Sequence, residues 1–167
     1  GRQNVLADYP LSSMMCLQLK ESNVFNDDNW RKPTYSTYGL KLAGPLRSIQ
    51  DYENNYALLK NVLASKIARY EHVFTHGPWG EYGHEEHVQV FKVIKDMQMS
   101  HSFSLWYPNY VSNKSYPLLF SHCKAFDFPW LTYPTACRFA QDVKRMYEKY
   151  HCWTWYKDWH WPANEVF

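Results

Sequence analysis

The sequence predicts an α/β protein, because short apolar runs of strand length alternate with segments of helical periodicity. We expect Ser13–Leu19 (SMMCLQL) and Tyr70–Thr75 to form strands, and Ser48–Arg69 lies between them with a helical pattern. A β-α-β order of this kind favours parallel strand pairing through a right-handed crossover. At 167 residues the chain fits one domain, residues 1–167, with a substantial core.

The segment Ser48–Arg69 is the clearest predicted helix. Its apolar residues recur at spacings of three and four, together with the following tyrosine: Tyr52, Tyr56, Leu59, Leu63, Ile67 and Tyr70. This stripe predicts a face that packs on a sheet, and Ser48 or Asp51 is expected to cap the start. Nearer the N-terminus, Gln3–Tyr9 has the character of a helix that ends before Pro10.

The second half of the chain predicts a strand, a helix and an aromatic tail. Ser102–Tyr107 is expected to be a strand, and Pro134–Tyr150 a helix. The expected buried face of that helix consists of Cys137, Ala140, Val143, Tyr147 and Tyr150. In the tail, the pattern of Trp153, Trp155 and Tyr156 suits an extended edge strand. These aromatic residues could stack on sugar rings, or they could seal the end of the domain.

Composition and charge exclude several classes of function. A net charge of +2 with mixed signs gives no electrostatic case for a nucleic acid or an anionic membrane as partner. No apolar run approaches the roughly 18 to 20 residues that a transmembrane helix needs, and no leader peptide is recognisable. Aromatic residues make up 19% of the chain, so some are expected on surfaces or in pockets.

The four cysteines, Cys16, Cys123, Cys137 and Cys152, show no CxxC spacing. Their mostly apolar neighbours predict buried free thiols, which favours a reducing compartment and a cytoplasmic protein.

The strongest functional signal lies between His72 and Ile94 (HVFTHGPWGEYGHEEHVQVFKVI). An apolar strand end leads into residues 76–83, a loop with three glycines and a proline. A helical face then follows, formed by His84, His87, Val88, Phe91 and Ile94. Ligands of open α/β sheets bind at such strand-to-helix corners.

The residue types at this corner indicate metal chemistry. Neutral imidazole is a common zinc ligand, and two histidines three residues apart can face one site. Glu85 and Glu86 occupy the first helical turn, where Glu86 could orient a histidine from behind. We expect the loop to contact the substrate through His76, Trp79, Glu81 and Tyr82. Glu81 could instead act as a metal ligand or an acid/base group.

Other interpretations of these residues stay open. A pair of histidines at HxxH spacing is often a pair of surface or capping residues, and the spacing differs from the HExxH of zincins. The segment supplies one or two of the three protein ligands that a catalytic zinc usually has. Asp27 and Asp28 could add ligands, although such acidic runs more often form turns. His122 is a further candidate site residue, although a core or surface histidine is the commoner case.

Residues 80–87, GEYGHEEH, resemble the G-x-x-G-H-x-D-H motif of the LmbE-like, N-acetylglucosaminyl-phosphatidylinositol de-N-acetylase (PIG-L) family. This resemblance implies a three-layer, Rossmann-like sandwich and a metal-dependent deacetylase of N-acetylated sugars. It implies that His87 binds the metal, zinc or another divalent ion. It also implies that His84 stabilises the oxyanion or assists proton transfer. Glu86 stands where the family has aspartate.

The family's earlier His-Pro-Asp-Asp motif is absent from the sequence. In the family this motif supplies further metal ligands and the general base, so no residue is assigned as the base here. We therefore expect an incomplete domain of this type that lacks the first strand and helix.

The expected function is hydrolysis of an amide on an N-acetylated sugar or glycoconjugate, catalysed by His84 and Glu86 with the metal on His87. One alternative is a non-catalytic carbohydrate-binding module that keeps the fold but has lost the full metal site. Another is an accessory protein in glycan assembly, for which a partner or a second copy of the chain completes the sheet.

Overall fold

The computed structural model describes residues 2–11, 13–25, 29–122 and 130–167. The chain divides into two compact units, one of residues 19–130 with Phe167, the other of residues 1–18 and 131–166. The described residues form a mixed α/β structure with five helices and three two-stranded sheets. The predicted α/β class is therefore confirmed.

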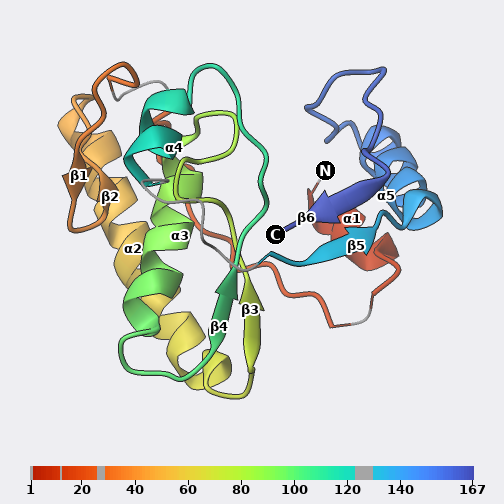
Figure 1. Cartoon of the computed structure of the whole chain (residues 1–167), viewed down its shortest axis with the longest axis horizontal. Coiled ribbons are helices and arrows are strands. Elements are labelled where there is room, and N and C mark those ends of the chain that lie inside the picture. Colours follow the sequence, from red (N-terminus) through yellow and green to blue (C-terminus); the bar gives the residue numbers. More distant parts are fainter. Residues whose placement is uncertain (1, 12, 26–28, 123–129) are drawn as a thin grey trace. The chain divides into compact units, whose positions relative to one another are not determined.

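The larger unit contains three helices and four short strands (Figure 1). In chain order these elements are β1 (Tyr35–Ser36), β2 (Gly39–Leu40), α2 (Leu46–Ile67), β3 (His72–Phe74), α3 (Glu85–Met97), β4 (Ser104–Trp106) and α4 (Tyr116–His122). Helices α2 and α3 pack side by side, and the β1–β2 hairpin contacts α3. Strands β3 and β4 pair in parallel, with α3 as the crossover between them.

Helix α2 confirms the helical pattern of the sequence. Tyr52, Tyr56, Leu59 and Ile67 from the predicted stripe are buried. The predicted cap is wrong: the N-cap is Pro45, and no side chain caps this end. Asp51 pairs with Lys20 at 2.6 Å instead.

The predicted strands Tyr70–Thr75 and Ser102–Tyr107 are confirmed as β3 and β4. The predicted strand Ser13–Leu19 is wrong, since no strand forms there. Met14 and Met15 are both exposed, and Gln18 has a left-handed φ of 51°, which interrupts an extended chain. Among the described residues, the parallel sheet therefore has two strands, and its β-α-β unit begins at the second predicted strand instead of the first.

The core of this unit lies directly behind the histidine-rich loop. A cluster of buried side chains is formed by Trp30, Leu40, Trp79, Val88 and Leu118. The Tyr52 hydroxyl, also buried, donates a hydrogen bond to the Glu85 carbonyl at 3.0 Å. The start of α3 is thereby fixed to α2 by a polar contact as well as by apolar packing.

The smaller unit consists of α1 (Arg2–Asp8), β5 (Thr132–Pro134), α5 (Cys137–Lys149) and β6 (Asn164–Val166). Strands β5 and β6 pair in antiparallel fashion, and α1 contacts α5. The predicted helix before Pro10 is confirmed as α1.

Two details of the smaller unit differ from the predictions. Pro134 ends β5, and helix α5 begins three residues later with Met146 as its buried residue, while Cys137 is exposed. The predicted strand through Trp153 and Tyr156 is absent. Its tryptophans pack on one another instead, with the Trp155 and Trp159 rings 4.7 Å apart. The alternating aromatic residues therefore pack against one another and do not form a sheet edge.

Cys16, Cys137 and Cys152 carry free thiols, as predicted. Their predicted burial is wrong for Cys16 and Cys137, which are exposed, and Cys123 lies outside the described residues. No helix in the described ranges combines the length and the apolar character that crossing a membrane requires.

Candidate metal centre

The loop between β3 and α3 is built from tight turns. The amide of Gly80 donates to the Gly77 carbonyl at 3.0 Å, and the amide of Gly83 donates to the Gly80 carbonyl at 2.9 Å. Three residues have left-handed backbone angles: Gly80 (φ 66°), Glu81 (φ 51°) and Gly83 (φ 86°). Glutamate rarely adopts this conformation, so surrounding contacts must hold Glu81 in place.

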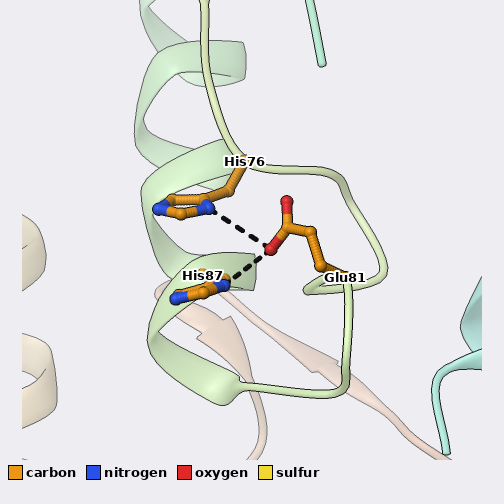
Figure 2. Close-up of side chains that lie close together, drawn as sticks. All are labelled: His76, Glu81 and His87. Atoms are coloured by element: carbon orange, nitrogen blue, oxygen red, sulfur yellow. Dashed lines mark hydrogen bonds and ion pairs between the residues drawn. The ribbon is translucent and has the colours of Figure 1, made fainter. Parts of the chain in front are cut away.

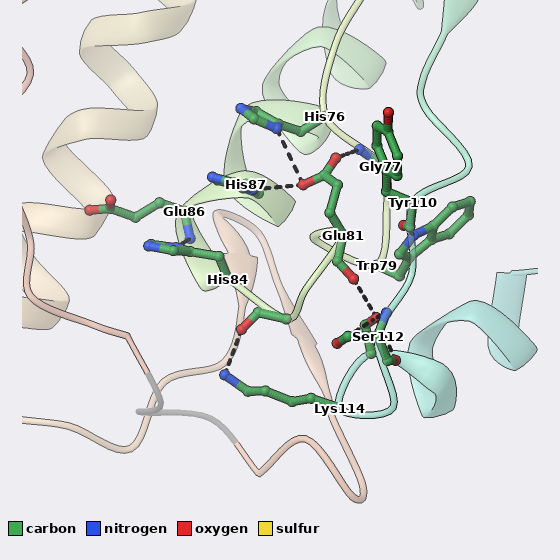
Figure 3. Close-up of polar contacts among 12 residues, drawn as sticks. His76, Gly77, Trp79, Glu81, His84, Glu86, His87, Tyr110, Ser112 and Lys114 are labelled. Carbon is green, nitrogen blue, oxygen red and sulfur yellow. Dashed lines mark hydrogen bonds and ion pairs between the residues drawn. The ribbon is translucent and has the colours of Figure 1, made fainter. Parts of the chain in front are cut away.

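Those contacts come from the segment that follows β4 (Figure 3). The Glu81 carbonyl accepts hydrogen bonds from the Ser112 amide at 3.2 Å and from the Ser115 hydroxyl. The Lys114 ammonium donates to the Gly83 carbonyl. Ser115 is fully buried, so its hydrogen bond is shielded from water. This segment fixes the backbone of the loop and with it the direction of the Glu81 side chain.

The Glu81 carboxylate lies against two histidines (Figure 2). One of its oxygens, Oε2, is 2.6 Å from His87 Nδ1 and 3.2 Å from His76 Nδ1. The other, Oε1, accepts a hydrogen bond from the Gly77 amide. The side chain of Glu81 is 9% exposed, against 21% for His87 and 42% for His76. The cluster therefore has a buried end at Glu81 and an accessible end at His76.

Burial alone would raise the pKa of Glu81. Hydrogen bonds from His76 and His87, the charge of His76 and the Gly77 amide outweigh burial and lower the pKa to about 2. Glu81 is thus a carboxylate at neutral pH and can only accept hydrogen bonds. The Nδ1 atom of His87, at hydrogen-bond distance, must then carry a proton.

Three imidazole rings form one stack at the start of α3. The His76 and His87 rings are 3.8 Å apart and inclined by 16°, and the His84 ring follows at 4.8 Å and 11° from His87. His84 is the N-cap of α3, and its Nδ1 accepts a hydrogen bond from the Glu86 amide at 3.2 Å. Neutral His84 therefore carries its proton on Nε2. Burial lowers the pKa of His84, and the neighbouring His87 lowers it further.

The two glutamates of the first turn point away from this stack. The Glu86 carboxylate accepts hydrogen bonds from the amide and hydroxyl of Ser22. The Glu85 carboxylate is fully buried and accepts from the Trp30 indole at 2.9 Å. Both positions suit the positive end of the helix dipole. The residue that holds histidines from behind is Glu81, and Glu86 contacts His84 through its backbone amide.

The two aromatic residues of the loop have different surroundings. Trp79 is buried in the core cluster, where its indole donates to the Tyr110 carbonyl. Tyr82 is 42% exposed and meets His87 and His84 edge-on, with centroid distances of 5.1 and 6.0 Å. Tyr82 is therefore the loop aromatic that a ligand can reach.

His122 ends α4, and its Nε2 contacts the Tyr35 hydroxyl. Asp27 and Asp28 lie outside the described residues. The sequence predicted His76 and Glu81 as substrate contacts, with a metal-ligand or acid/base role as the alternative for Glu81, and the structure groups both residues with His87. The sequence did not predict the contacts of Ser112, Lys114 and Ser115 with the loop. The dense glycines around Glu81 were the available signal that the loop turns back on itself.

His76, Glu81 and His87 could hold a metal ion, because each offers one ligand atom and these atoms lie within 4.8 Å of one another. Two imidazoles with one carboxylate form a donor set found in catalytic zinc sites and in non-haem iron sites. The donors thus fit a divalent transition metal, either with all three residues as ligands or with Glu81 behind the histidines.

No model of a protein family matches the chain, and neither a curated protein nor a solved structure matches it. Functional inference therefore rests on the geometry of this centre and on the motif in residues 80–87.

Proposed function

We propose that this protein is a metal-dependent hydrolase that removes the acetyl group from an N-acetylated sugar or glycoconjugate. The observation that carries the proposal is the stack of His76, His87 and His84 with Glu81 against it, at a β-α corner. The resemblance of residues 80–87 to the deacetylase motif supports the same chemistry.

The roles of the residues follow from their protonation. His87 and its neighbours His76 and Glu81 would hold the metal, which would supply polarisation of the amide carbonyl and a bound water of lowered pKa. His84 presents an Nε2–H, the donor that a developing oxyanion needs. In the overall reaction the oxygen of water bonds to the acyl carbon and the C–N bond breaks. The amine takes up a proton, and acetate leaves.

Tyr82 is the proposed contact for the sugar. Its ring is exposed and adjoins the histidine stack, and an aromatic ring can pack on the apolar face of a pyranose. The phenol hydroxyl can in addition bond to a sugar hydroxyl. This arrangement brings the ring of the substrate next to the groups that act on its acetamido substituent.

The test is release of primary amine from N-acetylglucosamine and its short oligomers by zinc-loaded protein, with chelator-treated protein as the blank. We expect turnover that His84→Ala reduces about 100- to 1,000-fold in kcat, the usual effect of losing one oxyanion donor. Bound zinc should remain near the wild-type level in this variant, because His84 is not assigned as a ligand. Zinc-loaded wild-type protein that releases no amine from these substrates would contradict the proposal.

A further inference from the structure

The cluster allows two arrangements of a metal, and its hydrogen bonds distinguish between them. In the first, His76, His87 and Glu81 all bind the metal. In the second, only the imidazoles bind it, and Glu81 holds them from the far side. Carboxylates that bond to the second nitrogen of a ligand histidine are common in metal sites, where they fix the ring and its tautomer.

The contacts of Glu81 decide which nitrogen of each ring is available. Both Nδ1 atoms face the same carboxylate oxygen, at 2.6 Å for His87 and 3.2 Å for His76. An ionised carboxylate accepts hydrogen bonds only, so it favours a proton on each Nδ1. The lone pair of each neutral ring is then on Nε2. Figure 2 shows this second nitrogen of both rings on the side away from Glu81.

The stacked rings must separate before both can bind one ion. The ring centroids are 3.8 Å apart and the planes are inclined by only 16°. An imidazole lone pair lies in the plane of its ring, so the two Nε2 lone pairs do not converge on one point in the stack. Two nitrogens at about 2.0–2.1 Å from a tetrahedral zinc, roughly 3.3 Å from each other, therefore require the His76 ring to turn out of the stack. His76 is the more exposed of the two side chains, so it is the ring that has room to turn.

Binding by Glu81 itself would break the contacts that hold its carboxylate. Its Oε2 would give up the hydrogen bond from His87 and the ion pair with His76, and the Oε1 contact with the Gly77 amide resists rotation of the carboxylate. The backbone of Glu81 is held by Ser112 and Ser115, which keeps the start of its side chain on the Nδ1 side of the rings (Figure 3).

We propose that Glu81 is a positioning residue that fixes His76 and His87 as Nδ1–H tautomers, so that their Nε2 atoms are the metal ligands. This inference rests on the proposed metal-dependent function and assigns the ligand atoms of the same site.

The test is nitrogen NMR of protein with ¹⁵N-labelled histidine, recorded without metal and after titration with zinc. We expect His76 and His87 to show a protonated Nδ1 without metal. Zinc should shift their Nε2 resonances and leave both Nδ1 protons in place. In Glu81→Gln, the amide can donate to Nδ1 as well as accept from it, so the tautomers should become mixed. Zinc affinity should fall about 10- to 100-fold, as when other such supporting groups are removed.

Glu71→Gln is the matched control, since it makes the same chemical change at an exposed glutamate directly before β3. It should leave the tautomers of His76 and His87 and the zinc affinity near those of the wild type. Loss of the Nδ1 protons on zinc binding would overturn the proposal and make Glu81 a ligand. So would Nε2–H tautomers in the metal-free protein.

The proposed function can fail separately in this experiment. Zinc that binds through Nε2 without any deacetylase activity would support the ligand assignment and contradict the proposed reaction. Wild-type protein that takes up no metal would overturn both the reaction and the ligand assignment, whatever tautomers it shows.

Discussion

Glu81 keeps a negative charge in a nearly buried position because two histidines and one amide surround its carboxylate. Its pKa of about 2 lies below its ordinary value of 4.5, so between these two pH values the unfolded chain binds more protons than the folded protein. The resulting stabilisation is present above pH 4.5 and is lost as the pH falls through about 2. The shift corresponds to on the order of 3 kcal/mol at neutral pH.

Glu81→Gln should therefore destabilise the metal-free protein at pH 7 far more than at pH 3. At the lower pH the wild-type carboxylate is losing its advantage over a neutral amide. The measurement is urea denaturation of both proteins in chelator at the two pH values. If the substitution lowered the free energy of unfolding by the same amount at pH 7 and at pH 3, the fold would not stabilise the charge of Glu81.

His84 is expected to stay neutral in mildly acid solution, because burial and then the neighbouring His87 lower its pKa. In an NMR titration of metal-free protein, its midpoint should lie below the ordinary value of 6.5. His87→Ala should raise the midpoint only partly, since burial remains. The folded protein resists protonation of His84, so this residue makes stability fall as the pH drops below 6.5. A wild-type midpoint above 6.5 would contradict the assigned environment.

At the scale of elements, the loop before α3 depends on two glycines whose surroundings differ. A Cβ at Gly80 would lie 2.6 Å from the His84 carbonyl oxygen, which belongs to the backbone of the helix start. A Cβ at Gly83 would meet the Lys114 side chain at 2.7 Å, and that flexible chain can move. Both positions have a left-handed φ, which costs a non-glycine residue about 1–2 kcal/mol.

Gly80→Ala should consequently lower the free energy of unfolding by more than Gly83→Ala. Both variants lose stability through the left-handed φ, but only Gly80→Ala also places a Cβ against backbone atoms. Chemical denaturation of the two variants beside the wild type measures this difference. The result would contradict the described turn if Gly83→Ala were equally or more destabilising.

Local patterns of sequence predicted the elements around the site but not the contacts within it. Helix α2 was predicted from its apolar spacing, and β3 from its apolar run and the glycines that follow. These signals involve residues that are close together in the chain, so the sequence alone was sufficient to predict both elements. The meeting of Glu81 with His76 and His87 depends on a left-handed residue inside the loop. It also depends on Ser115, which lies 34 positions from Glu81. No pattern within the motif encodes that distant support.

At the scale of the whole molecule, long-range pairing was again what the sequence did not predict. Strand β6 pairs with β5 across about thirty residues, and a short strand of this kind has no periodicity of its own. The apolar run Ser13–Leu19 had strand length, but it lacks β-branched residues and alternation, and its methionines are exposed. The α/β class followed from the order of strand-length apolar runs and helical segments, whereas the number of strands in each sheet depended on tertiary contacts.

The histidine cluster is expected to bind a metal ion, and elemental analysis of purified protein tests this most directly. After zinc loading and removal of free ion, we expect near-stoichiometric zinc in the wild type and its loss in His87→Ala. His101→Ala is the matched control, because His101 lies beyond the C-terminus of α3 with its Nδ1 near the Met97 carbonyl. It should retain zinc. A wild type without metal, or a His87→Ala variant that keeps it, would contradict the account.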